Sequence, residues 1–364
     1  MASADGLVGR DAELALTSAA VGRLSEGRPA VLAIEGEAGI GKTRLVQSIV
    51  DDARSRGMTV FYGRAHPFER TRPFAVVAAA LGLSARSSDP RSAGIGALLA
   101  GQGASASQPV GDIQYRIVDD IVELVETACA DHPVLLIAED IHWADTASLL
   151  TILSIVRRLS LAPLLTVVTT RPSPLPGEVV RLLDDLAAGG GQTLRLDPLE
   201  SDDVSALASY LLGAAPGPGL ITMLAKAGGN PLWATAILRS LVDEGVLRST
   251  SDGIDVTSSE LPTSLGELVV RRLRDLSGPA LDLLQVTAVL GDTVSLRDVA
   301  AVARRTPVDV AEQLGEAFDA QLLEEVDERV VFRHQLVHDA VYQHVPAPAR
   351  RLLHREAADR KSVV

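Results

Sequence analysis

The stretch GEAGIGKT at residues 36–43 decides how the rest of the sequence is interpreted. It fits the pattern G-x-x-x-x-G-K-[ST], in which the glycines let the backbone curl so that its N–H groups point at phosphate oxygens. In this pattern the lysine binds the outer phosphates and the hydroxyl of the last residue ligates Mg²⁺. We expect nucleotide phosphates to be bound by Gly36, Gly39, Ile40, Gly41, Lys42, Thr43 and Arg44.

The sequence on both sides of this loop supports a phosphate site. Residues 30–35 (AVLAIE) are a short apolar run that predicts a buried strand. Residues 42–56 have apolar side chains at helical spacing, and Gly57 can end that helix. A strand, a glycine-rich loop and a helix in this order place the phosphates at a helix N-terminus, which favours anions. A strand-to-helix turn without a ligand is the alternative.

Further apolar runs alternate with helical patterns up to residue 196. The runs predict four more strands, at 58–62, 134–138, 164–169 and 193–196. Three helical patterns lie between them, near 73–83, 115–130 and 146–159. Strands that alternate with helices indicate an α/β domain with a parallel sheet. Residues 85–112 are rich in Ser, Gly, Pro and Ala, and we expect a flexible insertion there with one short helix at 95–99.

Two adjacent acids, Glu139 and Asp140, follow the third apolar run. Ligands of an open α/β sheet bind at the carboxyl ends of its strands. We expect Glu139 to lie on the magnesium side and Asp140 to polarise the attacking water, with Thr43 and both carboxylates as the metal ligands. A pair of solvated loop carboxylates is the alternative.

The loop after this acidic pair contains three more polar or aromatic residues. Asp145 directly precedes a helical pattern, and we expect its carboxylate to cap that helix. His142 and Trp143 lie between the acids and this cap. For each of these two residues, packing is at least as good an explanation as a chemical role.

The pattern changes after Asp197, where we expect the strands to stop. Three helical patterns follow, at 202–212, 219–227 and 231–244, and the polar stretch 249–260 predicts a loop. Four more helices are predicted, at 265–276, 278–290, 295–303 and 307–320. Residues 322–326 and 330–333 predict a hairpin that turns at Asp327 and Glu328, and a last helix begins near His334. Helices followed by a small hairpin are typical of a winged-helix domain.

Composition excludes several classes of protein. The hydrophobic fraction of 47% and the charged fraction of 22% rule out wholesale disorder. A net charge of -13 and only 3% aromatic residues disfavour direct nucleic-acid binding. The single Cys129 rules out a disulfide framework and a multi-cysteine zinc site. The sequence has neither a membrane-spanning apolar run nor a signal peptide, so we expect a cytoplasmic protein with no membrane partner.

Taken together, the motifs resemble the signal-transducing ATPases with numerous domains (STAND), specifically the large ATP-binding regulators of the LuxR type. The stretch LVGRDAEL at 7–14 is similar to a family segment that packs on the adenine, which implies nucleotide contacts from Val8 and Arg10. The stretches GEAGIGKT and LLIAEDIHWAD, at 36–43 and 135–145, are similar to the Walker A and Walker B motifs of the family. The stretch TTR at 169–171 is similar to its sensor strand, which implies that Arg171 faces the terminal phosphate.

Two motifs in the second half of the chain also resemble this family. GGNPL at 228–232 is similar to its G-x-P element, which implies that Pro231 contacts the base. FRH at 332–334 is similar to its F-x-H stretch, which implies that His334 touches the β-phosphate of ADP. Four of these residues also have structural interpretations: a surface arginine at Arg10, the start of a proline-rich loop at Arg171, the first turn of a helix at Pro231, and a packed or strand-capping histidine at His334.

The resemblance implies a switch made of three parts. An α/β P-loop NTPase core with a RecA/AAA-like parallel sheet (1–196) would be followed by an all-α helical domain (197–262) and a winged-helix domain (263–364). ADP bound between them would hold a closed form, and ATP with an inducer, a small molecule or a protein, would release that form to self-associate. Hydrolysis would be slow. In a LuxR-type transcriptional activator, DNA would be bound only through a domain outside this chain.

Two features depart from the family pattern. Glu139 stands where the family commonly has an aspartate. The resemblance therefore does not predict the rate of ATP hydrolysis. The sequence also stops within a helix-like run at 350–360, and we expect the winged-helix domain to be truncated there.

Two other classes of function remain as alternatives. A constitutive P-loop ATPase or motor would turn over quickly, although the sequence lacks the L-S-G-G-Q signature of transporter ATPases. A nucleotide-dependent scaffold would bind ATP without hydrolysing it. The steady-state rate of ATP hydrolysis separates these classes from a slow switch.

Overall fold

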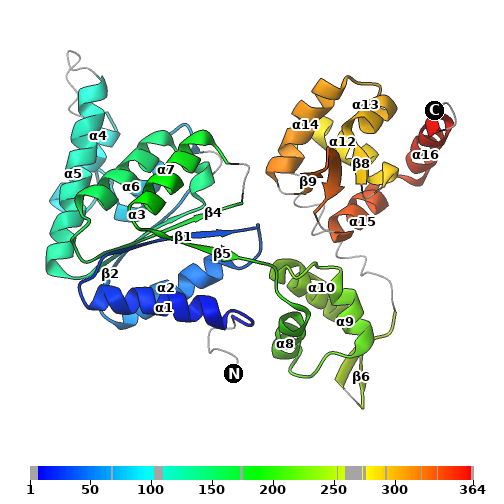
Figure 1. Ribbon diagram of the computed structural model, residues 1–364, viewed down its shortest axis with the longest axis horizontal. Coiled ribbons are helices and arrows are strands. Elements are labelled where there is room, and N and C mark those ends of the chain that lie inside the picture. The colour runs from blue at the N-terminus through cyan, green and yellow to red at the C-terminus, as the bar shows by residue number, and fades with distance from the viewer. Residues whose placement is uncertain are drawn as a thin grey trace. The chain divides into compact units, whose positions relative to one another are not determined.

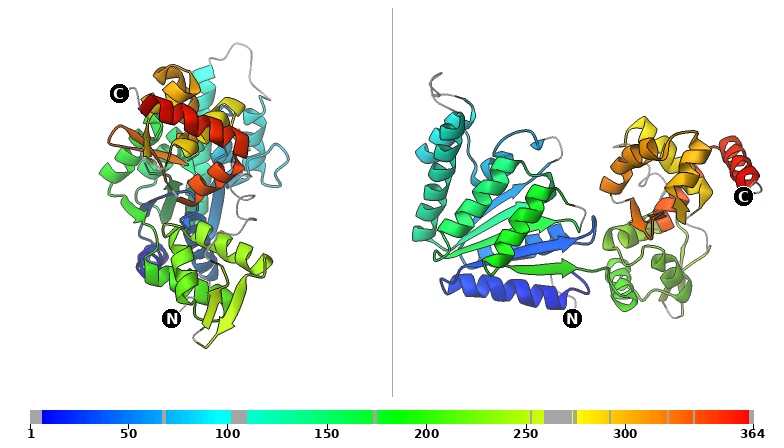
Figure 2. Two further views of the ribbon diagram at one scale, coloured as in Figure 1. Left: turned by 90° about the vertical axis from the view of Figure 1, so that its right-hand side faces the viewer. Right: turned by 45° about the horizontal axis from the view of Figure 1, so that its top comes forward.

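The computed structural model describes residues 7–66, 69–101, 110–172, 175–251, 253–258, 273, 276–291, 293–320, 322–333 and 335–361. The chain forms two compact units, one that ends at Asp197 and one that begins at Pro198. In Figures 1 and 2 the first unit runs from blue to green and the second from green to red. Among the residues described, none of the helices is both long enough and apolar enough to span a lipid bilayer.

The first unit is built on a five-stranded parallel sheet (Figure 1). Its strands are β1 (Ala30–Gly36), β2 (Thr59–Arg64), β3 (Val134–Glu139), β4 (Leu164–Thr170) and β5 (Gln192–Leu196). They lie in the order β2-β3-β4-β1-β5, and every neighbouring pair is parallel. All five carboxyl ends therefore meet at one edge of the sheet, where ligands of α/β proteins bind.

Helices cover both faces of this sheet, as the right-hand view of Figure 2 shows. One face is covered by α1 (Asp11–Ser25) and α2 (Lys42–Ser55). The other face is covered by α3 (Ala75–Leu81), α4 (Pro90–Leu99), α5 (Val110–Asp131), α6 (Thr146–Arg158) and α7 (Gly177–Ala188). Because the sheet is buried on both sides, every residue of the central strands β3 and β4 is buried. That burial explains why most residues of both strands are apolar.

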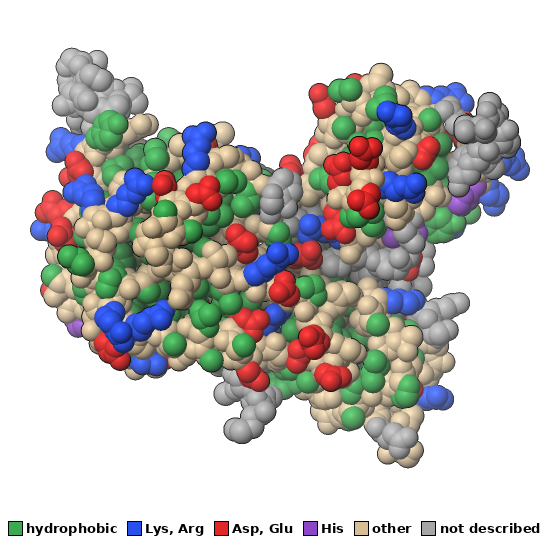
Figure 3. Space-filling model, in the orientation of Figure 1, with side chains coloured by type: hydrophobic (Ala, Val, Ile, Leu, Met, Phe, Trp, Pro, Cys, Tyr) green, Lys and Arg blue, Asp and Glu red, His purple; other side chains and the backbone are tan. Residues whose placement is uncertain are grey.

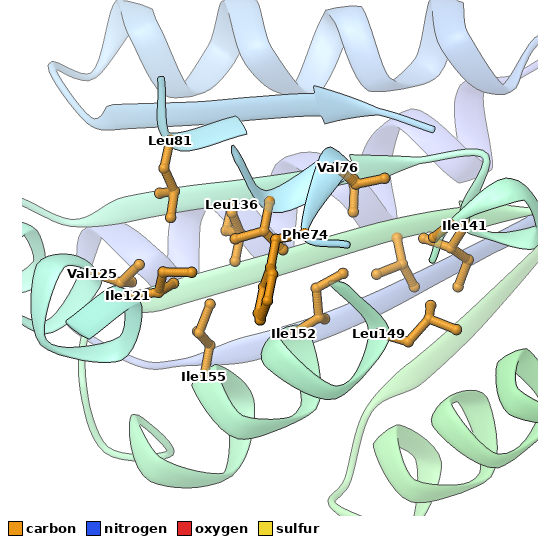
Figure 4. Packing of buried hydrophobic residues seen from close by; sticks show 14 of the residues in the cluster. Phe74, Val76, Leu81, Ile121, Val125, Leu136, Ile141, Leu149, Ile152 and Ile155 are labelled. Carbon is orange, nitrogen blue, oxygen red and sulfur yellow. The ribbon is translucent and has the colours of Figure 1, made fainter. Parts of the chain in front are cut away.

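Each face of the sheet has its own hydrophobic core. On the side of α1 and α2, Leu32 and Ile34 of β1 pack with Val21, Leu24 and Leu45. Figure 4 shows the core of the other face, where Phe74 lies against Leu136 and Ile152. Ile141, which follows β3, belongs to the same core and is fully buried. This anchors the loop after β3 to the interior.

The five strands predicted from apolar runs are confirmed. Three helices of the first unit differ from the prediction. No helix was expected at α1 or α7, and the helix expected at 95–99 begins earlier, at Pro90. The N-cap of α4 explains the earlier start, because the Asp89 carboxylate accepts a hydrogen bond from the Ser92 backbone N–H and proline suits the first helical turn. Residues 102–109 of the expected insertion lie outside the described residues.

The second unit begins with three helices and a hairpin. They are α8 (Ser201–Leu212), α9 (Pro218–Ala225), α10 (Pro231–Asp243), β6 (Leu247–Thr250) and β7 (Gly253–Val256). The expectations that strands stop after Asp197, and that 249–256 is a loop within an all-α domain, are therefore wrong. The hairpin depends on distant partners: the Ile254 N–H donates to Ala215 O at 2.8 Å, and Ile254 O accepts from the Gly217 N–H at 2.7 Å. Local sequence does not reveal such contacts.

The rest of the second unit combines helices with a three-stranded antiparallel sheet. The helices are α12 (Gly278–Leu290), α13 (Leu296–Ala303), α14 (Pro307–Asp319), α15 (Gln335–His344) and α16 (Ala347–Lys361). The strands are β8 (Thr293–Ser295), β9 (Leu323–Val326) and β10 (Arg329–Phe332), in the order β8-β10-β9. The predicted hairpin is confirmed, with Asp327 and Glu328 at positive φ in its turn. The three-residue β8 was not expected, and most of the predicted helix 265–276 lies outside the described residues.

Candidate functional site

The loop between β1 and α2 requires glycine at several positions. Gly39 and Gly41 have φ angles of 83° and 113°, which side chains of L-residues rarely allow. A Cβ atom on Gly36 would lie 2.7 Å from Cγ2 of Ile40. Gly41 is also the N-cap of α2, and no side chain caps this helix. The loop thus curls tightly and presents a helix N-terminus that has no side-chain cap, which suits an anion.

Lys42 is a buried cation inside this loop, with 9% of its surface exposed. Its ammonium Nζ donates to Gly36 O at 2.7 Å and to Glu37 O at 2.9 Å. Burial lowers the pKa of Lys42 to about 8, against the smaller opposing effect of the Asp140 charge. Among the described residues, Lys42 forms no ion pair. The protein therefore keeps an incompletely compensated positive charge at the centre of the loop.

Glu139, the last residue of β3, is almost completely buried. Its Oε2 accepts a hydrogen bond from the Thr43 hydroxyl at 3.1 Å. Its Oε1 is buried without a hydrogen-bond partner among the described residues. Burial raises the pKa of Glu139, whereas the Thr43 hydrogen bond and the Arg64 charge lower it. A hydroxyl and a carboxylate oxygen side by side are the kind of ligands that Mg²⁺ prefers.

Asp140 is held at both its backbone and its side chain. Its φ of 55° is left-handed, and its N–H donates to the Thr169 hydroxyl of β4 at 2.9 Å. Its Oδ2 accepts from Nε of Arg64 at 2.9 Å and lies 2.8 Å from the Nη2 of the same guanidinium. Arg64 also lies 3.9 Å from Oε2 of Glu139. Neither Arg64 nor Thr169 is predicted as a site residue from the sequence, although Thr169 belongs to the TTR stretch and Arg64 ends β2 just as Glu139 ends β3.

Arg171, directly after β4, contacts the loop that follows Asp140. Its Nε donates to Nε2 of His142 at 2.8 Å, and its guanidinium lies 4.8 Å from the centroid of the Trp143 ring. Burial and, after it, the charge of Arg171 lower the pKa of His142 to about 3. His142 is therefore neutral near pH 7 and accepts the hydrogen bond from Arg171.

Strand order explains why these groups meet. Arg64 ends β2, Glu139 ends β3 with Asp140 next to it, and Arg171 follows β4, and these are three adjacent strands. The phosphate-binding loop follows β1, the next strand of the sheet. The charges of all four of these residues affect the pKa of Lys42, as expected for groups gathered at one edge. Most of the predicted catalytic and phosphate-binding residues therefore lie in one group.

Arg10 and Val8 lie before α1, outside this group. Arg10 has only 6% of its surface exposed, so it is not an ordinary surface arginine. It donates to Asp197 O at 2.5 Å and to Oε1 of Glu13 at 2.8 Å. Val8 is half-buried. Arg10 thus ties the start of α1 to the end of β5, the strand next to β1, and a nucleotide contact from either residue stays a prediction.

Three further predicted contacts have different settings. Arg44 is exposed on the first turn of α2. Pro231 is the first residue of α10 in the second unit, where the Asn230 side chain caps the helix by accepting from the Leu232 N–H at 3.0 Å. His334 lies outside the described residues. The roles that the resemblance implies for these three stay predictions.

A metal ion at this site would need ligands beyond the protein. Within the described part of the chain, no three His, Cys, Asp or Glu side chains are grouped so that they could hold a metal ion. Mg²⁺ in phosphate-transfer sites is usually bound by one or two carboxylates together with the phosphates of the substrate. Thr43 and Glu139 fit that arrangement, since both present oxygen atoms beside the phosphate-binding loop.

Comparisons with known proteins agree with this geometry. Residues 6–168 match the family model described as an AAA ATPase domain. An uncharacterised protein of Rhizobium meliloti (strain 1021) is 26% identical over 383 residues, which cover 96% of this chain and 36% of that protein. The chain thus spans little more than a third of the length of this curated relative.

Two solved structures are similar to the chain. The ORC1 protein of Aeropyrum pernix in complex with DNA has a TM-score of 0.52 and 16% identity, with 95% of this chain and 94% of that chain covered. A STAND protein with a tetratricopeptide repeat sensor from Pyrococcus horikoshii has a TM-score of 0.37 and 18% identity, with 97% and 45% covered. The first likeness, the strand order and the glycine-rich loop show that the first unit has a P-loop ATPase fold of the AAA type.

Proposed function

We propose that the first unit binds ATP and ADP with Mg²⁺ and that the chain is a nucleotide-dependent switch. The observation that carries this proposal is the buried Lys42 ammonium, held by two carbonyls of the glycine-rich loop. A buried cation loses hydration, which is why the pKa of Lys42 falls to about 8. A phosphate anion on the loop would compensate that charge. The uncapped N-terminus of α2 favours the same anion.

We assign Mg²⁺ to Thr43 and Glu139, with Asp140 beside them. The Glu139 carboxylate already accepts from the Thr43 hydroxyl, and its other oxygen has no partner among the described residues. Bound Mg²⁺ would neutralise negative charge on the phosphate oxygens. Glutamate instead of aspartate at this position places its carboxylate close enough to contact Thr43 directly.

Asp140 is the residue that we assign to the attacking water. Both contacts from Arg64 go to Oδ2, so Oδ1 is the oxygen left to orient a water molecule and accept its proton. Arg64 occupies Oδ2, so only one oxygen of the carboxylate faces the water. This arrangement supports slow hydrolysis, as a switch requires.

We infer further that this switch regulates transcription. The support is the resemblance of its ordered motifs to LuxR-type regulators and the much greater length of its relative from Rhizobium meliloti. In this proposal a cytoplasmic inducer, a small molecule or a protein, promotes the ATP form, which self-associates. The helices and the β8-β10-β9 sheet after residue 276 would form the winged-helix domain, and Pro231 and His334 would contact the nucleotide. DNA would be bound by a domain outside this chain.

Direct DNA binding by this chain is the competing function, because the ORC1 protein with a similar fold is described in complex with DNA. The net charge of -13 opposes it. On the face shown in Figure 3, basic side chains are interspersed with acidic ones. A mobility-shift assay at physiological salt separates the two functions: a shift at sub-micromolar protein would support DNA binding and contradict our assignment.

Nucleotide titration and a steady-state hydrolysis assay test the main proposal. We expect the purified chain to bind fluorescent ADP and ATP, with Mg²⁺ tightening the binding of ATP, and to hydrolyse ATP much more slowly than the many turnovers per second of a motor. Fast constitutive turnover would indicate a motor. Tight ATP binding without any ADP production would indicate a scaffold, and absence of nucleotide binding would refute the assignment.

A further inference from the structure

Arg171 is restrained in two ways by residues of one short segment. The segment is η2 (Ile141–Trp143), a single 3₁₀ turn between Asp140 and Asp145. His142 accepts the Nε hydrogen of Arg171, and the Trp143 ring lies against the guanidinium at a cation–π distance. The terminal nitrogens of an arginine carry the four N–H groups that make bidentate contacts with phosphate. A bond at Nε therefore fixes the guanidinium plane without using those groups.

The segment that holds Arg171 is itself anchored at both ends. At its start, the Asp140 N–H is bonded to the Thr169 hydroxyl of β4 at 2.9 Å. At its end, Asp145 is buried and caps α6 by accepting from the Ser148 N–H at 2.8 Å, which confirms the predicted cap. The Asp145 carboxylate also accepts from the backbone N–H groups of Phe74 and Ala75 at the start of α3. These hydrogen bonds hold η2 in place relative to α3, α6 and the sheet.

The hydrogen-bond pattern of His142 defines its tautomer. Because Arg171 donates to Nε2, the proton of the neutral ring is on Nδ1. Nδ1 is buried and has no partner among the described residues. A buried donor without a partner costs stability, so packing alone does not favour histidine at this position. The hydrogen bond that His142 accepts from Arg171 would explain why a histidine is present here.

We propose that His142 and Trp143 are positioning residues that preorganise Arg171 for the terminal phosphate, so that the chain discriminates ATP from ADP. This inference rests on the proposed nucleotide function, in which Arg171 faces that phosphate. Fixing a guanidinium before binding removes part of the conformational entropy that binding would otherwise cost. The contact is with the terminal phosphate of ATP only, so the benefit affects ATP and leaves ADP affinity unchanged.

Variants of Arg171, His142 and Trp143 test this proposal by equilibrium binding. The ligands are ADP and a non-hydrolysable ATP analogue, so the measurement does not depend on turnover. Arg171→Ala serves as the reference for complete loss of the contact. His142→Asn places an amide only as far out as Nδ1 and should lose the bond to Arg171. His142→Gln extends a carbonyl about as far as Nε2 and should keep it.

We expect His142→Asn to weaken binding of the ATP analogue about two- to tenfold, the effect of freeing one long side chain. ADP affinity should not change, and His142→Gln should bind both nucleotides like wild type. Trp143→Leu should resemble His142→Asn, whereas Trp143→Phe, which keeps an aromatic face, should show a smaller loss.

The outcomes separate this inference from the function on which it rests. If wild type binds no nucleotide, the proposed function fails. If Arg171→Ala lowers the affinity for the ATP analogue but His142→Asn matches wild type, or weakens ADP and ATP equally, then His142 does not position Arg171. Unchanged binding by Arg171→Ala removes the role of Arg171 itself.

A measurement on nucleotide-free wild type tests the hydrogen bond without any risk of misfolding. Nitrogen-15 spectra of histidine-labelled protein, with His142 assigned from the His142→Gln variant, report which ring nitrogen carries the proton. We expect a protonated Nδ1 and an unprotonated Nε2 for His142. A proton on Nε2 would contradict the bond from Arg171 and overturn the proposal.

Discussion

His142 in the first unit and His338 in the second are both shielded from solvent, but their ring nitrogens are satisfied to different extents. His142 uses only Nε2, whereas His338 places Nε2 at 2.9 Å from Ala288 O and Nδ1 at 3.1 Å from Oδ1 of Asp339. The ring of His338 also packs edge-on against Phe332. His338 is therefore explained by the packing of α15, while His142 is explained only when Arg171 is considered.

The carboxylates of the two units show the same contrast. Burial raises the pKa of Glu139 at the edge of the sheet. In the second unit, the backbone N–H groups of Val256, Leu220 and Gly219 lower the pKa of Asp255, and the Ser277 N–H lowers that of Glu316. Hydrogen bonds from the N–H groups of a helix start stabilise an ionised carboxylate. Burial with one oxygen left without a hydrogen bond destabilises it. Such costs gather where a ligand binds, which is why we place the site in the first unit.

The largest effect is expected from replacing Lys42, the buried cation of the first unit. Lys42→Ala should weaken binding of ADP and ATP by about a hundredfold or more, the loss expected when a buried charge partner is removed. Lys226→Ala, in the second unit, is the matched control and should bind like wild type. Titration with fluorescent ADP checks both variants, and wild-type affinity in Lys42→Ala would move the site away from the loop.

The second prediction separates the two adjacent acids. Asp140→Asn should retain ATP binding and lose hydrolysis about a hundredfold, because an amide cannot accept the proton of the water. Glu139→Gln should instead reduce the effect of Mg²⁺ on ATP binding. Binding titrations with and without Mg²⁺, together with a hydrolysis assay, check the pair. Hydrolysis at the wild-type rate in Asp140→Asn would show that the two roles are assigned wrongly.

The third prediction concerns stability and has opposite signs in the two units. Glu139→Gln removes a buried charge whose ionised form burial disfavours, and it should raise the unfolding temperature of nucleotide-free protein by about 2–4 °C. Asp255→Asn removes an acceptor for the N–H groups at the start of α9 and should lower the unfolding temperature. Calorimetry near pH 7 checks both signs, and shifts in the same direction would contradict the contrast.

The pH dependence of Asp255 follows from the direction of its pKa shift. Because its pKa is lower in the folded chain than the ordinary 3.8, its stabilising contribution is complete above that value. The contribution is lost as pH falls through the lowered pKa. Wild type and Asp255→Asn should therefore differ in stability near neutral pH and converge in strong acid. A difference that persists in strong acid would assign the effect to packing.

The sequence predicts the parts of the site that depend on local patterns. The buried strands, the loop around Lys42 and the cap at Asp145 all follow from patterns within about ten residues. Arg64 and Thr169 could not be found in this way, because their contacts with Asp140 depend on β2 and β4 flanking β3 in the sheet. Strand order is a property of the fold and does not follow the order of the strands in the sequence.

The hairpin of β6 and β7 was missed for the same reason. Its backbone bonds to Ala215 and Gly217 join segments that lie nearly 40 residues apart. Asp255 gains its partners at the start of α9 only once this hairpin has formed. The pair formed by Arg171 and His142, 29 residues apart, likewise becomes visible only when the ends of β3 and β4 are adjacent.

The smallest effect is expected from replacing Arg64. Whether the rate of ATP hydrolysis then rises or falls is informative. The Arg64 side chain is 44% exposed, and pairs of this kind contribute little to stability. Arg64→Ala should leave nucleotide affinity close to wild type but release Oδ2 of Asp140, so that both carboxylate oxygens can accept from the attacking water. We expect ATP hydrolysis to rise about two- to fivefold, within the range of an exposed ion pair. Arg72→Ala, at an exposed arginine of the same unit, is the control. A fall in hydrolysis instead would mean that Arg64 positions Asp140 for catalysis, and the slow turnover of the switch would then need another cause.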